Sequence, residues 1–241
     1  QTLIIYMKDQ VTGLQVELLY GVLPEYDVIT RSAKVINTEE DKIRLTKAQA
    51  ACIDFVHGEF DVISFYGRHA MERNMQRTSV GHGAFVIGSR RGTSSHQYNP
   101  MMILAEKETT EDAGTCYGMS FVYSGGFKAE VEKDQFGQTR MQMGLQEEQF
   151  SYPLKKGEEF VIPEVILTCS NQGLEKLSQN LQRCIRKNLC RGKYKEKVRP
   201  VLINSWEACY FDFTGEDIYH LAEQAKDLGI DMVVLDDGWF G

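Results

Sequence analysis

The chain has 241 residues, of which 42% are hydrophobic and 25% are charged, and its formal net charge is −7. This balance is typical of a globular protein, and the acidic charge argues against a nucleic-acid-binding protein as a whole. No apolar run is long enough to span a bilayer, and no secretory signal is visible at the amino terminus. The length allows one large domain, or one domain and part of another.

The six cysteines are scattered singly, at positions 52, 116, 169, 184, 190 and 209. None belongs to a Cys-x-x-Cys pair, and none stands beside histidines at the spacing of a zinc site. Single cysteines in apolar surroundings are typical of small buried hydrophobic side chains. No Asn-x-Ser/Thr glycosylation signal is present. We therefore expect a reduced, cytoplasmic protein without a metal or other cofactor, although six cysteines could arithmetically form three disulfides.

Residues 1–170 are predicted to be mostly β-structure. Short alternating or apolar runs recur between turn signals, and their spacing is typical of a large antiparallel sandwich. The predicted strands are 2–6, 14–20, 28–35, 42–53, 60–66, 85–87, 101–105, 116–122, 127–132, 139–145 and 159–168. Residues 124–126, Ser-Gly-Gly, predict a hairpin turn between their flanking strands, and Gly137 and Gln138 predict a second one.

Residues 67–100 carry many Arg and His side chains with few acidic ones. Such polar density predicts either an exposed loop or a loop ordered by a network of hydrogen bonds. Its sequence Gly-Thr-Ser-Ser-His at 92–96 misses the nucleophile elbow of serine hydrolases, because its fifth residue is His rather than Gly. The cationic residues are Arg68, His69, Arg73, Arg77, His82, Arg90, Arg91 and His96.

Residues 171–199 change character to a helix followed by a basic tail. Apolar residues recur at helical spacing on one face. They are Leu174, Leu177, Leu181, Cys184 and Ile185. A basic segment could bind nucleic acid, but this one lacks the interleaved aromatic residues that stack on bases. We interpret it as a solvated linker helix that leads to Pro200.

Residues 201–241 predict a strand, a helix and a second strand. Residues 201–203 and 230–235 are apolar runs, Thr214 and Asp217 form a capping-box signal, and Gly229 is a helix stop. Two parallel strands joined by a helix are the repeat of an α/β fold, in which ligands bind at the carboxyl ends of the strands.

Both tryptophans and a pair of carboxylates fall at that predicted rim. Trp206 follows the first strand, and Asp236, Asp237 and Trp239 follow the second. Carboxylates accept hydrogen bonds from several hydroxyl groups and an aromatic ring covers an apolar sugar face, so the set suits a polyol. Two alternatives remain open: a turn stabilised by an Asp side chain, and a magnesium or calcium site, which is less favoured because no further acidic cluster is near.

Three segments together resemble the bacterial α-galactosidases of glycoside hydrolase family 36. Residues 89–100 read SRRGTSSHQYNP, residues 199–213 read RPVLINSWEACYFDF, and residues 234–241 read VLDDGWFG. The resemblance covers the whole chain in order. It implies an antiparallel β-supersandwich over 1–170, a helical linker over 171–200, and the first strand-helix-strand of a (β/α)₈ TIM barrel over 201–241.

The resemblance also implies the roles of the rim residues. Asp236, Asp237 and Trp206 match substrate-binding residues, whereas the nucleophile and the acid/base are expected beyond Gly241. Retaining glycosidases need two carboxyl groups about 5–5.5 Å apart in opposite roles. Adjacent side chains of an extended segment point to opposite sides, so binding suits the pair better than catalysis. We therefore expect the 241-residue chain alone to be inactive.

The implied function is hydrolysis of terminal α-galactosyl groups, as in melibiose and raffinose. The alternative is a non-catalytic carbohydrate-binding or assembly module. In tetrameric relatives, loops of the amino-terminal domain reach a neighbouring active site, and Arg73 lies in the matching region. We expect a homotetramer with Arg73 at or near a subunit contact, and neither nucleic acid nor a membrane as a partner.

Overall fold

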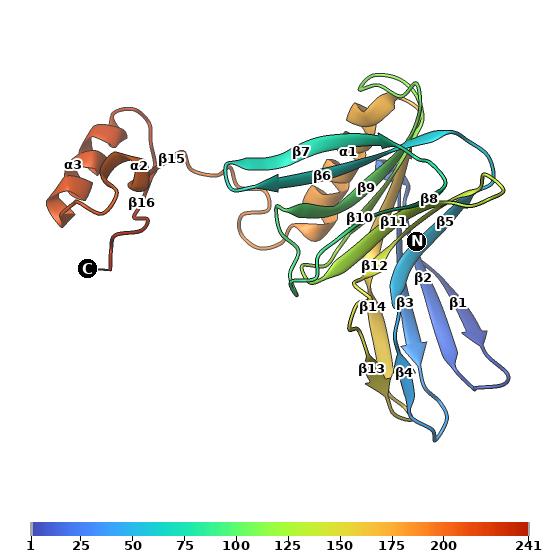
Figure 1. Ribbon diagram of the computed structural model, residues 1–241. Coiled ribbons are helices and arrows are strands. Elements are labelled where there is room, and N and C mark those ends of the chain that lie inside the picture. The colour runs from blue at the N-terminus through green and yellow to red at the C-terminus, as the bar shows by residue number, and fades with distance from the viewer. Residues whose placement is uncertain (1, 241) are drawn as a thin grey trace. The chain divides into compact units, whose positions relative to one another are not determined.

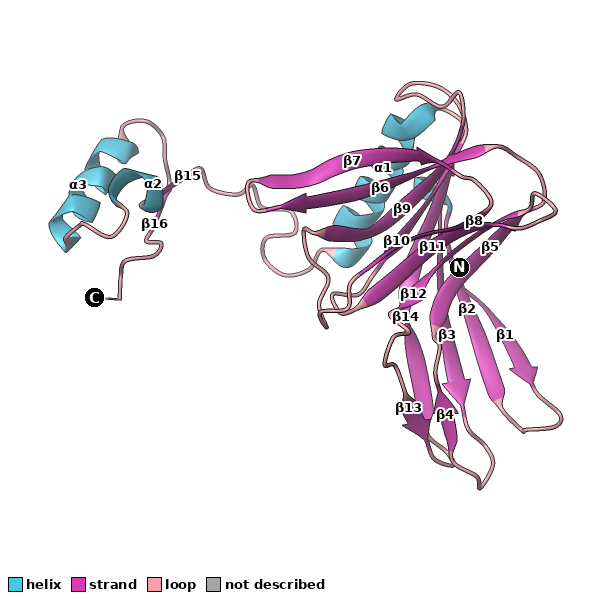
Figure 2. Ribbon diagram, in the orientation of Figure 1, coloured by secondary structure: helices cyan, strands magenta, loops and turns pink. Residues whose placement is uncertain are grey.

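The computed structural model describes residues 2–240, which divide into two compact units between Lys187 and Asn188. The amino-terminal unit consists mainly of β-strands, and the carboxy-terminal unit contains short strands and helices (Figures 1 and 2). Within residues 2–240, no helix is long and apolar enough to cross a membrane.

The amino-terminal unit is built on an antiparallel sheet of eight strands. Their order is β1-β2-β3-β14-β10-β9-β6-β7. The bounds are Thr2–Lys8 for β1, Gln15–Leu23 for β2, Val28–Ile36 for β3, Glu159–Ser170 for β14, Cys116–Phe121 for β10, Tyr98–Glu106 for β9, Phe60–Arg68 for β6 and Met71–Ser79 for β7. The 3₁₀ turn η1, Pro24–Tyr26, connects β2 to β3.

A second antiparallel sheet of four strands completes the sandwich. Its order is β5-β12-β11-β8, with bounds Gln49–Phe55, Thr139–Leu145, Phe127–Lys133 and Gly83–Gly88. A separate pair joins β13, Tyr152–Leu154, to β4, Ile43–Leu45. The prediction of a mainly β, antiparallel sandwich is confirmed.

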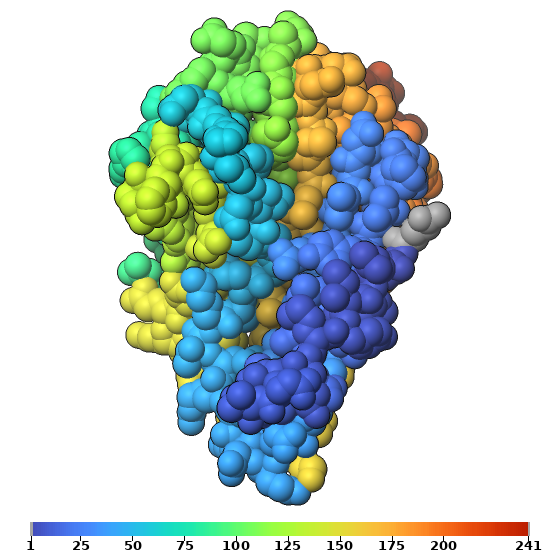
Figure 3. Space-filling model, turned by 90° about the vertical axis from the view of Figure 1, so that its right-hand side faces the viewer, coloured from blue at the N-terminus to red at the C-terminus, as the bar shows by residue number. Residues whose placement is uncertain are grey.

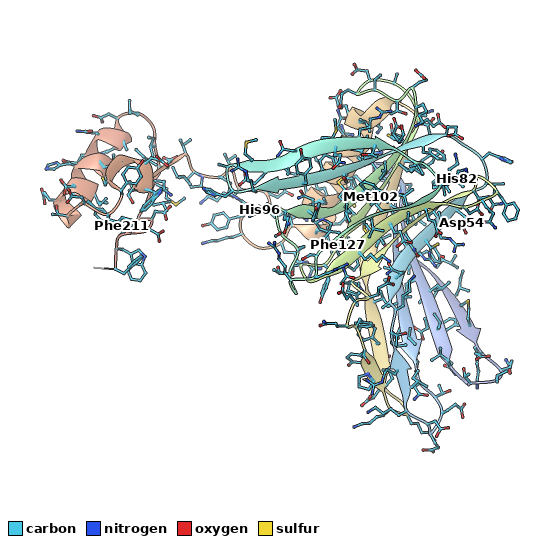
Figure 4. All side chains as sticks on the ribbon, in the orientation of Figure 1. Asp54, His82, His96, Met102, Phe127 and Phe211 are labelled. Carbon is cyan, nitrogen blue, oxygen red and sulfur yellow. The ribbon has the colours of Figure 1, made fainter. Side chains whose placement is uncertain are left out.

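The core lies between the two sheets, where Met102 of β9 and Phe127 of β11 are both fully buried (Figure 4). Along β11 the buried residues Phe127, Ala129 and Val131 alternate with the half-buried Lys128 and Glu130. This period of two places one apolar face on the core, as expected for a strand of a two-layer sandwich.

Helix α1, Gly173–Cys184, packs against β14 and β10 of the eight-stranded sheet and confirms the predicted helix. Leu177 of α1 is fully buried. A Cβ placed on Gly118 of β10 would lie 3.2 Å from the Cδ2 atom of Leu177. The absence of a side chain at Gly118 therefore allows the helix to approach the sheet closely. A π-helical turn, Ile185–Leu189, follows.

Much of the segment 67–100, which was predicted to be a loop, forms strands. The loop prediction was therefore wrong for β7, and for the part of β8 outside the predicted strand 85–87. Strand β7 lies at the edge of its sheet, and most of its residues are exposed. A strand that is polar on both faces has no alternating apolar pattern, which is why the sequence did not reveal it. The run predicted at 42–53 is divided between β4 and β5.

One of the two predicted hairpins was also wrong. Residues 124–126 connect β10 of the eight-stranded sheet to β11 of the four-stranded sheet, so they cross between layers. The Gly137 hairpin is confirmed, with Lys133 paired to Thr139 and the Asp134 carboxylate accepting from the N–H of Phe136 at 2.9 Å. A turn signal marks a change of direction, but it does not say which sheet the next strand joins.

The carboxy-terminal unit contains β15, Leu202–Asn204, α2, Trp206–Cys209, α3, Gly215–Lys226, and β16, Met232–Val234. Strands β15 and β16 are parallel, which confirms the predicted strand-helix-strand unit. Both strands come from apolar runs, but Leu202 and Met232 are exposed. A two-stranded sheet with one helix between its strands cannot cover both of its faces.

Helix α3 begins and ends at the predicted residues. The Thr214 side chain accepts from the Asp217 N–H and the Asp217 carboxylate accepts from the Thr214 N–H, which is a complete capping box. At the other end Gly229 has a φ of 77°, and the N–H of Ile230 donates to the carbonyl oxygen of Ala225. This is a Schellman motif, and it satisfies carbonyl groups of the last turn.

Thr214→Ala is expected to lower the free energy of unfolding of the carboxy-terminal unit by about 1 kcal/mol, because it removes the cap of α3. The protein has two tryptophans, Trp206 and Trp239, and both lie in this unit. Urea unfolding followed by tryptophan fluorescence therefore measures this unit selectively. Thr214→Ser keeps the hydroxyl group and is the control; equal midpoints for Ala and Ser would contradict the capping role.

Candidate functional site

The carboxyl ends of β15 and β16 meet at one edge of the carboxy-terminal unit. The two strands pair in parallel with Asn204 opposite Val234. Trp206 begins α2 two residues after Asn204, and Asp236 follows Val234 by two residues. The structure therefore brings Trp206 and Asp236 to the same rim, as the sequence predicted.

Hydrogen bonds from three polar residues tie the two strand ends together. The Asn204 Nδ2 donates to Asp236 Oδ2 at 2.6 Å, and Asn204 Oδ1 accepts from the Trp206 N–H at 2.8 Å. The Asp236 N–H donates to Ser205 Oγ at 3.1 Å, and Ser205 is fully buried. Asn204 and Ser205 were missed in the sequence analysis, although a polar pair directly after a predicted strand was the signal that could have identified them.

The two adjacent carboxylates have different surroundings. Asp236 is half-buried, and the Asp237 N–H donates to its Oδ1 atom at 2.8 Å. The hydrogen bond from the Asn204 amide, and then the one from the Asp237 N–H, hold the pKa of Asp236 below its usual value. Asp237 is exposed, and its carboxylate has no hydrogen-bond or ion-pair partner within residues 2–240. The turn interpretation therefore explains the hydrogen bonds that the Asp236 carboxylate accepts. It leaves the Asp237 carboxylate available to a ligand.

Aromatic side chains surround this rim. Trp206 packs edge-to-face against Tyr210 and Phe211, with ring centroids 5.2 and 4.9 Å apart. Trp239 is 68% exposed and packs edge-to-face on Phe240. Figure 4 shows Phe211 at the surface of this unit. Exposed aromatic rings beside a free carboxylate can bind a ligand that has both an apolar face and hydroxyl groups.

The metal alternative lacks a ligand set. In the described part of the chain, no three or more His, Cys, Asp or Glu residues are grouped so that they could hold a metal ion. Asp236 already accepts from Asn204 and from the Asp237 N–H.

Arg73 lies on β7, beside a bulge in its pairing with β6. A Cβ on Gly67 would lie 2.4 Å from the Met71 carbonyl oxygen, so the bulge requires glycine there. Arg73 itself has a φ of 54° and lines a cavity of about 430 Å³, together with Asn99 and Leu177. Arg73 is exposed, and its side chain has no hydrogen-bond partner among residues 2–240.

The loop after β8 is ordered by its own hydrogen bonds, as one of the two sequence interpretations proposed. Ser89 Oγ donates to the Thr93 carbonyl oxygen at 2.6 Å, and Arg90 forms an ion pair with Glu148. The loop borders a cavity of about 630 Å³ that Lys128 also lines. Figure 4 shows His96 of this loop far from His82 and Asp54 at the other end of the unit.

Comparison with known proteins accounts for the whole chain. The family described as the glycosyl hydrolase family 36 N-terminal domain matches residues 1–155, and the family described as melibiase matches residues 159–241. The chain belongs to glycosyl hydrolase family 36. The resemblance that the three sequence segments indicated is confirmed, and the match to the amino-terminal family model covers strands β1 to β13 but not β14.

Curated relatives of family 36 match the chain from end to end. The bifunctional α-galactosidase/sucrose kinase AgaSK of Mediterraneibacter gnavus is 64% identical over all 241 residues, which are 26% of its own length. The α-galactosidase Mel36A of Lactobacillus acidophilus is 45% identical, with 33% of its length covered. The chain thus spans about a quarter to a third of the length of these relatives.

Solved structures of family 36 share the same fold. The galactosidase domain of AgaSK superposes with a TM-score of 0.94 over 100% of this chain and 33% of that one. A variant of the α-galactosidase AgaA of Geobacillus stearothermophilus, in complex with stachyose, is 43% identical. It superposes with a TM-score of 0.96 over 100% of this chain and 33% of that one. Because these relatives are glycosidases along the whole length of the match, a separate non-catalytic module is not favoured.

Proposed function

We propose that the chain is the amino-terminal portion of an α-galactosidase, a retaining glycosidase that hydrolyses terminal α-galactosyl groups of oligosaccharides related to melibiose and raffinose. The observation that carries the proposal is the 64% identity to AgaSK over all 241 residues. The AgaA complexes with stachyose and raffinose support oligosaccharides of this class as substrates.

In this proposal the rim of the carboxy-terminal unit binds the sugar. Asp237 accepts charge-assisted hydrogen bonds from hydroxyl groups, because its carboxylate has no other partner among residues 2–240. Asp236 offers a second carboxylate whose position Asn204 fixes. Trp206 covers an apolar face of the ring. The nucleophile and the acid/base are expected beyond Gly241, since two adjacent carboxylates poorly suit the opposed roles of a retaining mechanism.

The proposed domain organisation follows from the same family. Residues 1–170 form the β-supersandwich domain, residues 171–200 the helical linker, and residues 201–241 the start of a (β/α)₈ catalytic barrel. The parallel pairing of β15 with β16 around α3 supports the last assignment. Among residues 2–240 no disulfide joins two cysteines, which supports a reduced, cytoplasmic setting.

The proposed assembly is a homotetramer with Arg73 at or near a subunit contact. An exposed guanidinium on a bulged edge strand supports this role, because Arg is enriched where two proteins meet. The light-scattering experiment described below tests whether the protein associates with itself.

Activity is tested with the longer protein that contains this sequence, assayed with nitrophenyl α- and β-galactosides and with raffinose. We expect release of nitrophenol from the α-anomer only, and release of galactose from raffinose. Retention of the α-configuration in the first-formed galactose, followed by NMR, tests the retaining mechanism. Binding of galactosides without turnover would favour the carbohydrate-binding module instead.

A further inference from the structure

Strand β1 leaves one edge of the eight-stranded sheet open, and its side chains are apolar on both faces. All seven residues of Thr2–Lys8 are exposed, with Leu3 at 56% and Tyr6 at 72%. Among residues 2–240, β1 pairs with β2 alone. Edge strands that stay unpaired usually carry charges or proline, but this one has five successive uncharged, apolar residues before Lys8.

The apolar stripe on one face of β1 continues the core of the sandwich. In the pairing with β2, Ile5 lies beside Leu18 and Met7 lies beside Val16. Leu18 and Val16 pack against the core between the two sheets. Figure 1 shows β1 and β2 extending away from the four-stranded sheet, and Figure 3 shows this dark-blue segment at the surface. The stripe is therefore apolar like the core, but its side chains are exposed within residues 2–240.

We propose that β1 pairs with β1 of a second copy of this chain, antiparallel and about a two-fold axis that passes beside Ile5. In this register Leu3 lies opposite Met7, Ile4 lies opposite Tyr6, and Ile5 lies opposite its own counterpart. Residues that face each other in an antiparallel pair lie on the same face, so both apolar rows continue into the second copy. The contact is self-complementary, as two-fold symmetry requires.

Charge favours this orientation over a parallel one. Lys8 is the charged residue of β1, and in the antiparallel register it lies opposite the uncharged Thr2. A parallel pairing would place the two Lys8 side chains side by side, which is unfavourable. The neighbouring Asp9 is occupied in its own turn, where it accepts from Thr12 Oγ1 at 2.5 Å. The same lack of charge gives an acidic or basic partner nothing to recognise.

The expected area makes this a reversible contact. A strand of seven residues is about 24 Å long, and pairing along one edge adds a single line of contacts of that length to each copy. A standard stable interface buries about 800 Å² per partner. We therefore expect a dimer that dissociates on dilution through the micromolar range, and that forms one of the contacts of the homo-oligomer proposed above. The inference rests on that oligomer and not on the sugar chemistry.

Two double variants of the 241-residue chain test the contact and its register. Leu3→Lys with Met7→Lys places lysines opposite lysines across the axis at two positions. Leu3→Lys with Met7→Glu places each introduced lysine opposite an introduced glutamate of the other copy. Both variants lose the same apolar side chains, so they differ in the sign of one charge. Phe136→Lys, at an exposed position in the β11–β12 turn, is the control for added surface charge.

Light scattering at a series of concentrations measures the dissociation constant, and circular dichroism confirms folding. We expect the Lys/Lys variant to dissociate at a concentration at least about tenfold higher than the wild type, and the Lys/Glu variant to stay within about threefold of it. Equal weakening of both variants would overturn the register. An oligomer unaffected by Lys/Lys would overturn the role of β1 and leave another contact for the assembly. A wild-type chain that is monomeric throughout would overturn the contact, and the galactoside assay would be unaffected.

Discussion

Asp61→Ala is expected to lower the free energy of unfolding of the amino-terminal unit by about 2–4 kcal/mol. The Asp61 side chain is 12% exposed and accepts from Arg77 Nε at 2.8 Å and from Lys107 Nζ at 2.5 Å. Its removal leaves two cations close together without a counter-charge. Breaking a fully buried pair costs about 3–5 kcal/mol, and the loss here is smaller because both cations keep some contact with water.

The Asp61 network also holds the turn after β9 in place. Arg77 donates to the carbonyl oxygens of Thr109 at 2.6 Å and Lys107 at 2.9 Å. Asp61 orients the Arg77 guanidinium, so its loss weakens these backbone contacts as well. One carboxylate thus connects β6, β7 and the segment that follows β9, which is why we expect the large effect.

Asp54→Ala is the matched control in the same unit. Asp54 accepts from Arg140 Nε at 2.7 Å, but the two side chains are more than half exposed. Pairs of this kind contribute about 0.2–1 kcal/mol. Guanidinium unfolding followed by far-UV circular dichroism measures both variants, because the amino-terminal unit is rich in strands and contains no tryptophan. Equal losses in the two variants would show that the burial of Asp61 adds nothing.

The stabilisation by Asp61 should depend on pH. Burial alone raises the pKa of Asp61, but hydrogen bonds from Lys107, Arg77 and Ser79 outweigh this and hold the pKa below its usual value. A carboxyl group whose pKa is lower in the folded state stabilises the protein above its unfolded-state pKa, near pH 4, and loses that contribution as the pH falls through the folded-state value. The difference in stability between wild type and Asp61→Asn should therefore shrink below about pH 4.

Asp237→Asn, in the longer protein, is expected to lower kcat/KM for α-galactosides about 10- to 150-fold. A charge-assisted hydrogen bond to a sugar hydroxyl group contributes about 1.5–3 kcal/mol, which corresponds to that range. Asp237 makes no compensating contact among residues 2–240, so the fold should be unaffected. Steady-state kinetics with a nitrophenyl α-galactoside measure the effect, and tryptophan fluorescence tests the integrity of the unit.

Two further variants separate binding from positioning. We expect Asp236→Asn to lower kcat/KM. Asn204→Ala removes the amide that donates to Asp236 Oδ2 but keeps the carboxylate, so we expect it to lower kcat/KM in part. Asp231→Asn changes an acid at the amino end of β16, away from the rim, and should leave the kinetics unchanged. If both Asp236→Asn and Asp237→Asn had wild-type kinetics, the two aspartates would only stabilise a turn and would not bind the sugar.

The parts of the structure that the sequence predicted well depend on neighbouring residues. The capping box at Thr214 and the helix stop at Gly229 are contacts between residues three to five positions apart, and both are present. Strands such as β11 were predicted because alternation along one segment records which of its faces is buried. The rim was predicted for the same reason, since Trp206 and Asp236 directly follow runs that the sequence indicates as strands.

Only the tertiary structure decided which strands pair and what each carboxylate contacts. Residues 124–126 cross between sheets, and β7 is an edge strand, because pairing depends on segments far away in the chain. The sequence alone does not distinguish the roles of Asp236 and Asp237. The Asn204 amide, 32 positions before Asp236, donates to the Asp236 carboxylate and not to that of Asp237. Local patterns encode local geometry and the burial of a face, whereas long-range pairing arises when the whole chain maximises buried apolar area and satisfied hydrogen bonds together.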